Sequence, residues 1–358
     1  MSMELGLSRF KNTDGISCYM VSILHILQHI PIFTDLLINK TVIVKEHKTV
    51  IYELTKIINK ILTSNSIKIG PYKFKKIICE MDSMWNDEDQ QDSQEFYTFL
   101  INKIEDELGN CIIYIPNITK NIDNNNSLNI ENIENKSLIN IIALNYIHKS
   151  EARDYSYIKN LFVGYLISNI KCSLCNTISP SFESFLTLAL SIPINKNTNN
   201  NTIYRLEECL NLFVNAEKLD KFNKLTCDIC GIKNQSIKTF QIWKAPKILV
   251  IQLKRFITNA YGIQTTKIVN PITYPVNNFN IIEYIHPESP YKINTIYNLI
   301  GINIHKGIIN AGHYISIIKN RYNNNWYLYD DDNRPIKIDD NDDLIQNRNA
   351  YLLFYLIQ

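Results

Sequence analysis

The sequence predicts an α+β protein, with helices in the first third of the chain and strands in the last two thirds. Its 358 residues are 45% hydrophobic and 20% charged, a composition typical of a globular chain that can bury a large core. In the first third, apolar residues recur at the spacing of amphipathic helices. Later segments are short β-branched and aromatic runs bounded by turn residues, as expected for strands.

Three segments near the start of the chain have a helical pattern. Each carries an apolar stripe at helical spacing, and the first ends before Pro31, which cannot continue a helix. A capping residue, Asp92 or Ser93, precedes the third stripe. The predicted helices run from Ser17 or Cys18 to about Gln28, from Val50 to Leu62, and onward from the segment Gln90–Glu95.

Four later segments have the composition of strands. The first is a continuous apolar run suited to a buried strand, and the others are rich in aromatic and β-branched residues. They are Ile248–Leu253, His313–Ile318, Trp326–Tyr329 and Tyr351–Leu356. Asparagine-rich stretches at 117–137, 195–202 and 323–325 predict loops or insertions rather than core.

The charge pattern gives no reason to expect a nucleic-acid partner. The net charge is +2, and the densest basic cluster is Lys73, Lys75 and Lys76, which we interpret as a solvated face rather than a DNA-binding stripe. The first 13 residues contain no signal-peptide core, and no apolar run has the length of a membrane span. We therefore expect a soluble intracellular chain, cytoplasmic or nuclear, or located in a host cytoplasm if the chain is viral.

Four of the eight cysteines form two Cys-x-x-Cys pairs, Cys172 with Cys175 and Cys227 with Cys230. In a reducing compartment this spacing favours metal over disulfides, and four thiolates suit one tetrahedral Zn²⁺. The 52 positions between the pairs exceed a compact zinc ribbon, so the pairs should meet at the tip of a long β excursion. A complete Cys₄ shell predicts a structural ion. The alternative is four ordinary core cysteines, as we expect for Cys79, Cys111 and Cys209.

Three residues from opposite ends of the chain have the chemistry of a thiol nucleophile, its base and an orienting acid. Cys18 stands at a predicted helix N-terminus, where the helix dipole favours a thiolate. His313 follows Gly312 at the start of a predicted strand, and Asp330 lies 17 positions later, enough for one antiparallel hairpin. Taken singly, each has a structural alternative: a core cysteine, a core histidine, and an aspartate in a solvated acidic turn.

At these residues the chain resembles the ubiquitin-specific proteases, a family of papain-like cysteine peptidases. The matching motifs follow the family's order from Gly6 to Tyr355, essentially the whole chain. In the cysteine box and the following Gln-Gln-Asp motif they are Gly6-Leu7, Asn12, Cys18–Met20, Ser22 and Gln90–Phe96. Further along they are Leu161–Gly164, both Cys pairs, Ala245–Phe256, His305–Gly307, Gly312–Tyr314, Trp326–Asp331 and Ala350–Tyr355.

The resemblance implies a hand-like fold in a single catalytic domain, residues 1–358. A helical thumb would span residues 1–115 and carry the cysteine, and an Asn-rich insertion and linker would span 116–160. Zinc-tipped fingers would occupy mainly 161–250, and a β palm carrying the histidine mainly 251–358. We expect a monomer that binds ubiquitin, ubiquitinated proteins or polyubiquitin.

The resemblance also implies hydrolysis of the peptide or isopeptide bond after the C-terminal Gly-Gly of ubiquitin. By this resemblance Cys18 is the nucleophile, His313 the base and Asp330 the orienting acid, and Asp331 assists the oxyanion or the deacylating water. The resemblance further implies that Asp92, Glu95 and Tyr314 contact ubiquitin. Of these, Asp92 and Glu95 would hold the basic residues of its tail.

One departure concerns the oxyanion hole. The family places an Asn five positions before the cysteine, whereas Asn12 stands six positions before Cys18. An oxyanion donor contributes about 3–4 kcal/mol of barrier reduction, so a misplaced Asn12 would leave a slow enzyme. The shifted Asn12 leaves open a pseudo-enzyme that binds ubiquitin without cutting it. The Gly-Gly tail that several modifiers share leaves open a protease for another ubiquitin-like modifier. A zinc-ribbon nucleic-acid module would rest on the Cys pairs alone, and the near-neutral charge disfavours it.

Overall fold

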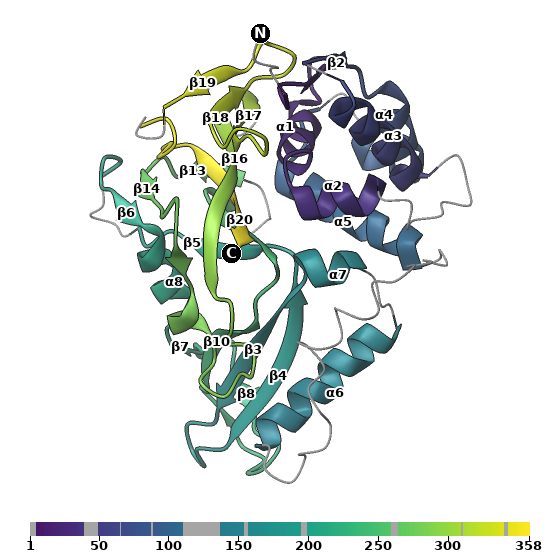
Figure 1. Cartoon of the computed structure of the whole chain (residues 1–358). Helices are drawn as coiled ribbons and strands as arrows, with labels where there is room; N and C mark the ends of the chain where they lie inside the picture. Colours follow the sequence, from purple (N-terminus) through teal and green to yellow (C-terminus); the bar gives the residue numbers. More distant parts are fainter. Residues whose placement is uncertain are drawn as a thin grey trace.

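The protein has a helical lobe packed beside a large β-sheet, from which a second sheet projects (Figure 1). The computed structural model describes residues 5–38, 49–64, 66–86, 89–109, 137–153, 157–194, 199–258, 264–308, 311–339 and 343–358. This mixture of helix and sheet confirms the predicted α+β class.

The helical lobe is formed by the N-terminal part of the chain. It contains α1 (Cys18–Leu27), α2 (Pro31–Ile38), α3 (Val50–Leu62), α4 (Tyr72–Met81), η1 (Ser83–Asn86), α5 (Ser93–Gly109) and the parallel pair β1 (Arg9–Phe10) and β2 (Lys68–Ile69). The three predicted helices are confirmed as α1, α3 and α5. At the start of α3, the carboxylate of Glu107 accepts hydrogen bonds from the backbone N–H groups of Val50 and Ile51, both at 2.8 Å. Because these N–H groups have no partner within their own helix, Glu107 joins α5 to α3.

The large sheet supplies the other wall of the core. Its strands, in spatial order, are β19 (Ile336–Ile338), β18 (Trp326–Tyr329), β17 (Ala311–Lys319), β16 (Ile296–Ile308), β20 (Ala350–Ile357), β11 (Ile248–Lys254) and β5 (Leu188–Ser191), with β15 (Phe279–Asn280) also paired to β16. Neighbouring strands are antiparallel, except that β5 runs parallel to β11. The four predicted strands are confirmed as β11, β17, β18 and β20.

Both faces of the sheet are buried. Side chains alternate between faces along a strand, so Val250 and Phe354 pack toward the helical lobe while Ile251 and Leu353 join a second core. The helix α8 (Leu206–Val214) contributes Leu206 and Leu210 to that second core. The helical lobe and α8 therefore lie on opposite faces of the sheet, which explains the near-continuous apolar sequence of β11.

The second sheet forms the projection seen at the bottom of Figure 1. Its order is β4 (Ile178–Phe185), β3 (Gly164–Lys171), β10 (Ile237–Lys244) and β7 (Glu217–Lys218), and a hairpin of β8 (Leu225–Thr226) and β9 (Lys233–Asn234) lies nearby. The range expected for fingers, 161–250, thus contains this sheet. The same range also contains β5, which pairs with β11 and belongs to the large sheet instead.

The remaining described elements pack around the two sheets. They are α6 (Leu138–Arg153), α7 (Tyr157–Phe162), η3 (Ile282–Tyr284), and the pairs β6 (Tyr204–Arg205) with β14 (Ile272–Thr273) and β12 (Phe256–Thr258) with β13 (Gln264–Lys267). The range 116–160, expected to be insertion and linker, contains α6, whose Ala143 and Ile147 pack with Phe182 and Trp243. That part of the range therefore belongs to the folded structure.

Several predictions fall wholly or partly outside the described residues. Cys111 and nearly all of the asparagine-rich stretch 117–137 lie there, as do residues 195–198 of the second stretch. The third stretch, 323–325, joins β17 to β18 as predicted. Within the described ranges, no single helix has the length and apolar composition to cross a membrane, although α1 and α2 pass that test as a pair bent by 89°.

Candidate active site

Cys18 is the first residue of α1, and it is fully buried. The backbone carbonyl of the preceding residue, Ser17, accepts the first helical hydrogen bonds, from the N–H groups of Met20 at 3.1 Å and Val21 at 3.0 Å. The thiol of Cys18 lies 4.0 Å from the carbonyl oxygen of Ile16. The sulfur therefore lies at the positive end of the helix dipole.

His313 and Asp330 meet across the hairpin of β17 and β18. The strands pair Ser316 with Tyr329, so the residue that follows Tyr329 comes beside the start of β17. There Nε2 of His313 lies 2.7 Å from Oδ1 of Asp330. The hairpin predicted from the 17-residue spacing is therefore present, and it brings carboxylate and imidazole together.

The charge on the His313 imidazole is strongly stabilised. Hydrogen bonding to Cys18 is the largest cause that raises the pKa of His313 to about 9, and the bond to Asp330 raises it further while burial opposes both. Because Nε2 faces Asp330, Nδ1 is the ring nitrogen left for Cys18. A thiolate beside such an imidazolium, a thiolate–imidazolium pair, is the reactive form of a thiol nucleophile.

Asn12 reaches the start of α1 despite its extra position. Its side-chain oxygen Oδ1 accepts a hydrogen bond from the backbone N–H of Ser17 at 3.0 Å, and its Nδ2 donates to Oδ2 of Asp331 at 3.1 Å. The intervening turn uses Gly15 at φ +78°, a left-handed conformation that glycine adopts without strain. Since an amide nitrogen carries two hydrogens, one N–H of Asn12 remains for another acceptor.

Asp331 borders the same loop and has an unusual environment. It has φ +47°, and within the described part of the chain its buried Oδ1 has no hydrogen-bond partner. Burial raises the pKa of the Asp331 carboxyl, while the bond from Asn12 and the charge of His313 oppose the change. A buried carboxylate oxygen without a protein partner is suited to accept a hydrogen bond from water.

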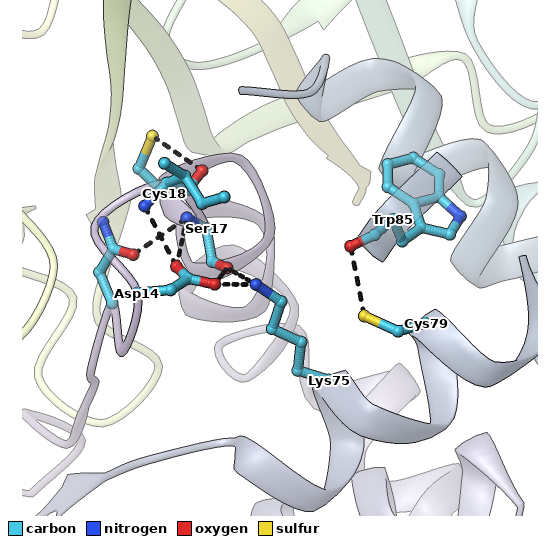
Figure 2. A network of polar contacts seen from close by, with 8 residues as sticks. Asp14, Ser17, Cys18, Lys75, Cys79 and Trp85 are labelled. Atoms are coloured by element: carbon cyan, nitrogen blue, oxygen red, sulfur yellow. Dashed lines mark hydrogen bonds and ion pairs between the residues drawn. The ribbon is translucent and has the colours of Figure 1, made fainter. Parts of the chain in front are cut away.

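Lys75 corrects one expectation from the sequence. Lys73 and Lys76 are exposed, as expected for a solvated face, whereas Lys75 points from α4 into the loop before Cys18 (Figure 2). Its Nζ donates to Oγ of Ser17 at 2.8 Å and forms an ion pair with Asp14. The sequence alone does not reveal that Lys75 is buried differently from Lys73 and Lys76, because this difference depends on which side of α4 faces the loop.

The three residues implied to contact ubiquitin differ in burial and in the contacts that they already make within the protein. Asp92 caps α5: its Oδ1 accepts from the N–H of Gln94 at 2.6 Å, and its Oδ2 accepts from the hydroxyl of Tyr351 at 2.7 Å. Glu95 is exposed as a residue. The pKa of its carboxyl is nevertheless raised, first because the carboxyl is partly desolvated and then because of the nearby charge of Asp92. Tyr314 is buried, with its ring 4.8 Å from that of His305.

The four paired cysteines form a cluster at the end of the projection. Sγ of Cys172 lies 3.9 Å from Sγ of Cys230, and Sγ of Cys175 lies 3.6 Å from Sγ of Cys227. All four sulfur atoms lie within 4.8 Å of one another. Tetrahedral Zn²⁺ with bonds of about 2.3 Å would separate its sulfur ligands by about 3.8 Å. The predicted meeting of the two pairs is confirmed, and the cluster could hold a metal ion.

Two further cysteines in the described ranges, Cys79 and Cys209, are structural in their surroundings. Cys209 is fully buried, and burial raises the pKa of its thiol to about 12. Cys79 packs against the helical core, and its thiol donates to the carbonyl oxygen of Trp85 at 3.2 Å. Burial also raises the pKa of Cys79. Both thiols are therefore held in their neutral, unreactive form.

Sequence reasoning missed two contacts that join the lobe to the sheet. Gln90 accepts, through Oε1, a hydrogen bond from the backbone N–H of Gly312 at 3.0 Å, next to His313. Asn303 on β16 donates to Ser22 of α1 at 2.9 Å and accepts from Ser93 of α5 at 2.8 Å. Gln90 lies in a recognised motif, but Asn303 has no local signal because its partners are distant in sequence.

Comparison with known proteins places this geometry in a family. The sequence profile described as "Ubiquitin carboxyl-terminal hydrolase" matches residues 9–355. The chain belongs to this family. The resemblance predicted from the ordered motifs is therefore confirmed.

The chain is similar to catalogued proteins and to solved structures of this family. It is 28% identical to Ubiquitin carboxyl-terminal hydrolase Usp2 of Drosophila melanogaster over 98% of the chain and 35% of that protein. It is 28% identical to Ubiquitin carboxyl-terminal hydrolase 2 of Bos taurus over 98% of the chain and 55% of that protein. The chain thus spans about a third to a half of these relatives.

A solved structure gives the same fold. Ubp8 in the SAGA Ubp8/Sgf11/Sus1/Sgf73 DUB module bound to ubiquitin aldehyde matches with a TM-score of 0.71 and 26% identity. The match covers 100% of this chain and 71% of that chain. The predicted hand-like protease architecture is thereby confirmed as a fold.

Proposed function

We propose that this chain is a cysteine-type deubiquitinase that cleaves the peptide or isopeptide bond after the C-terminal Gly-Gly of ubiquitin. The observation that carries the proposal is the convergence of Cys18, His313 and Asp330 in a member of this hydrolase family. The similar structure bound to ubiquitin aldehyde supports ubiquitin as the substrate, because an aldehyde at that C-terminus would present its carbon to the thiol.

Acylation uses the thiolate–imidazolium pair. Cys18 attacks the carbonyl carbon of the terminal glycine, and the bond to the leaving amine breaks as His313 donates its proton to that amine. The products are a ubiquitin thioester on Cys18 and a free lysine or N-terminal amine. Asp330 holds the imidazole in the required tautomer and stabilises its charge.

Asn12 and Asp331 serve the oxyanion and the water in this scheme. In this proposal the second N–H of Asn12 Nδ2 donates a hydrogen bond to the oxyanion. A carboxylate at Asp331 would repel an oxyanion, so we assign Asp331 to orienting Asn12 and to accepting a hydrogen bond from the deacylating water at Oδ1. Water activated by His313 then attacks the thioester and releases ubiquitin and the Cys18 thiol.

For the basic tail of ubiquitin, we assign the stronger contact to Glu95. Both oxygens of Asp92 already accept hydrogen bonds from the protein, whereas Glu95 is exposed. An exposed carboxylate can accept a charge-assisted, bidentate bond from an arginine. Asp92 then contributes through its charge and by fixing the start of α5.

For the four-cysteine cluster, we propose one structural Zn²⁺ held by Cys172, Cys175, Cys227 and Cys230. The sulfur separations support a tetrahedral ion, and Asn234 donates to Sγ of Cys172 at 3.3 Å as an outer-shell partner would. The ion would supply no reaction chemistry, because four thiolates leave no open position.

A ubiquitin probe with a C-terminal electrophile tests the proposal. We expect the probe to label the native chain at Cys18 and the Cys18→Ala variant not at all, because Cys18 is the thiol that contacts the His313 imidazole. The Cys209→Ala variant, which removes a buried thiol in the core, should label like the native chain. Labelling elsewhere, or none in the native chain, would contradict the proposal.

The same experiment separates ubiquitin from other modifiers. Several ubiquitin-like proteins share the Gly-Gly tail, so the active site alone does not distinguish them. Parallel labelling with a probe of each modifier should give the fastest reaction with ubiquitin. A faster reaction with the probe of another modifier would identify that modifier, rather than ubiquitin, as the substrate.

A further inference from the structure

The longer loop between Asn12 and Cys18 contains a cap built on the side chain of Asp14. Oδ1 of Asp14 accepts hydrogen bonds from the backbone N–H groups of Ile16 at 3.1 Å and Ser17 at 2.9 Å. Oδ2 of the same carboxylate accepts from the hydroxyl of Ser17 at 2.8 Å. These three bonds turn the longer loop back toward the start of α1.

Lys75 anchors this cap from a different element. Its helix α4 is fixed by the buried side chains of Phe74 and Ile78, so the position of Lys75 is set by the core rather than by the loop. Nζ of Lys75 contacts both Oγ of Ser17 and the carboxylate of Asp14 (Figure 2). The two charged side chains are only 19% and 29% exposed, so solvent screens their attraction less than that of a surface pair.

The cap is connected directly to Asn12. The backbone N–H of Ser17 is shared between Oδ1 of Asp14 and Oδ1 of Asn12, at 2.9 and 3.0 Å. Ser17 is also the residue before the nucleophile. A shift of the Asp14 carboxylate would therefore move the Ser17 N–H and, with it, the amide of Asn12.

We propose that Lys75 and Asp14 are positioning residues that place Asn12 and the start of α1 for catalysis. In this way the pair offsets the extra residue in the loop. The kinetic consequences of this inference rest on the proposed deubiquitinase activity, whereas its structural consequences do not. Neither residue contacts the reacting atoms, so both act through Ser17 and Asn12.

Steady-state kinetics on a ubiquitin C-terminal fluorogenic amide provide the first test. We expect Lys75→Ala to lower kcat by about 10- to 100-fold, the scale of a small misplacement of a catalytic group, with KM changed less than about twofold. Lys75→Arg, which keeps the charge toward Asp14, should recover much of the loss. Lys76→Ala is the matched control, because that exposed neighbour pairs only with Glu80 at 3.8 Å in the described structure, and it should match the native chain.

A double-mutant cycle separates positioning from a general loss of stability. If Lys75 acts through Asn12, Lys75→Ala should lower kcat little further in an Asn12→Ala background. Additive losses, a loss mainly in KM, or an equal loss in Lys76→Ala would overturn the inference.

Hydrogen exchange at the Ser17 amide keeps the inference testable apart from activity. Lys75→Ala should speed exchange at Ser17 by tenfold or more, while amides in the interior of α1 stay protected. If the native chain has no turnover, the proposed function fails, but this measurement still applies. Unchanged exchange at Ser17 would overturn the positioning role in either case.

Discussion

His313 is the residue whose ionisation controls the proposed chemistry. Its pKa lies near 9 in the folded chain because Cys18, first, and Asp330 stabilise the imidazolium. The unfolded value is about 6.5. Because folding raises this pKa, the interaction stabilises the fold fully below about pH 6.5, and its contribution is lost as the pH rises to 9.

The pH dependence of activity follows from the same shift. We expect kcat/KM to decline above about pH 9, as the imidazolium that protonates the leaving amine is lost. Asp330→Asn removes one stabilising interaction, so its alkaline limb should move to lower pH. The measurement is kcat/KM against pH for both proteins, with Asp332→Asn as the control. An alkaline limb that does not move in Asp330→Asn would show that Asp330 does not act on His313.

At the scale of elements, short turns and hairpins bring reactive side chains together. The β17–β18 hairpin positions His313 against Asp330, and the β8–β9 hairpin brings Cys227 and Cys230 to the turn after β3. In both cases the local sequence determines the hairpin through its turn residues. Which other element it meets is decided by the pairing of distant strands.

The four-cysteine cluster predicts a link between metal, stability and binding. Cys227→Ser removes one of four sulfur ligands, so we expect bound zinc to fall from one per chain toward zero. The melting temperature and the affinity for ubiquitin should fall together. Asp228→Ala changes an exposed residue in the same turn and should retain the metal. Unchanged zinc content in Cys227→Ser, measured by elemental analysis, would contradict the assignment of four cysteine ligands to one ion.

At the scale of the whole molecule, α1 and the large sheet bring the two ends of the chain into one site. All ten residues of α1 are buried, and the helix approaches β16 closely at Gly301. A Cβ added at Gly301 would lie 2.8 Å from Cγ2 of Ile26. The missing side chain therefore lets the helix with Cys18 reach the sheet with His313.

This close approach predicts a specific coupling. Gly301→Ala should destabilise the fold by about 1–3 kcal/mol, because extra volume in a packed core forces the helix outward. Ile26→Ala should also destabilise it, by about 2–5 kcal/mol. The double variant should lose less than the sum, since the second change removes the clash. Chemical denaturation of the four proteins measures this coupling, and strict additivity would contradict it.

The sequence by itself determined the local elements and the chemical groups. Helical spacing identified α1, α3 and α5. A continuous apolar run identified β11, and aromatic and β-branched runs identified β17, β18 and β20. Two Cys-x-x-Cys pairs identified the four-cysteine cluster. These features depend on neighbours in the chain, so local patterns carry them. The ordered motifs also identified Cys18, His313 and Asp330 as one set.

Only the tertiary structure decided how the longer loop before Cys18 is accommodated. The one-residue shift of Asn12 implied a misplaced donor, yet Gly15 turns the chain and Asp14 caps it, so that Asn12 reaches Ser17. Lys75 completes this cap from a helix nearly sixty residues away. No local pattern distinguishes Lys75 from its exposed neighbours, because its role depends on the packing of α4 against the core.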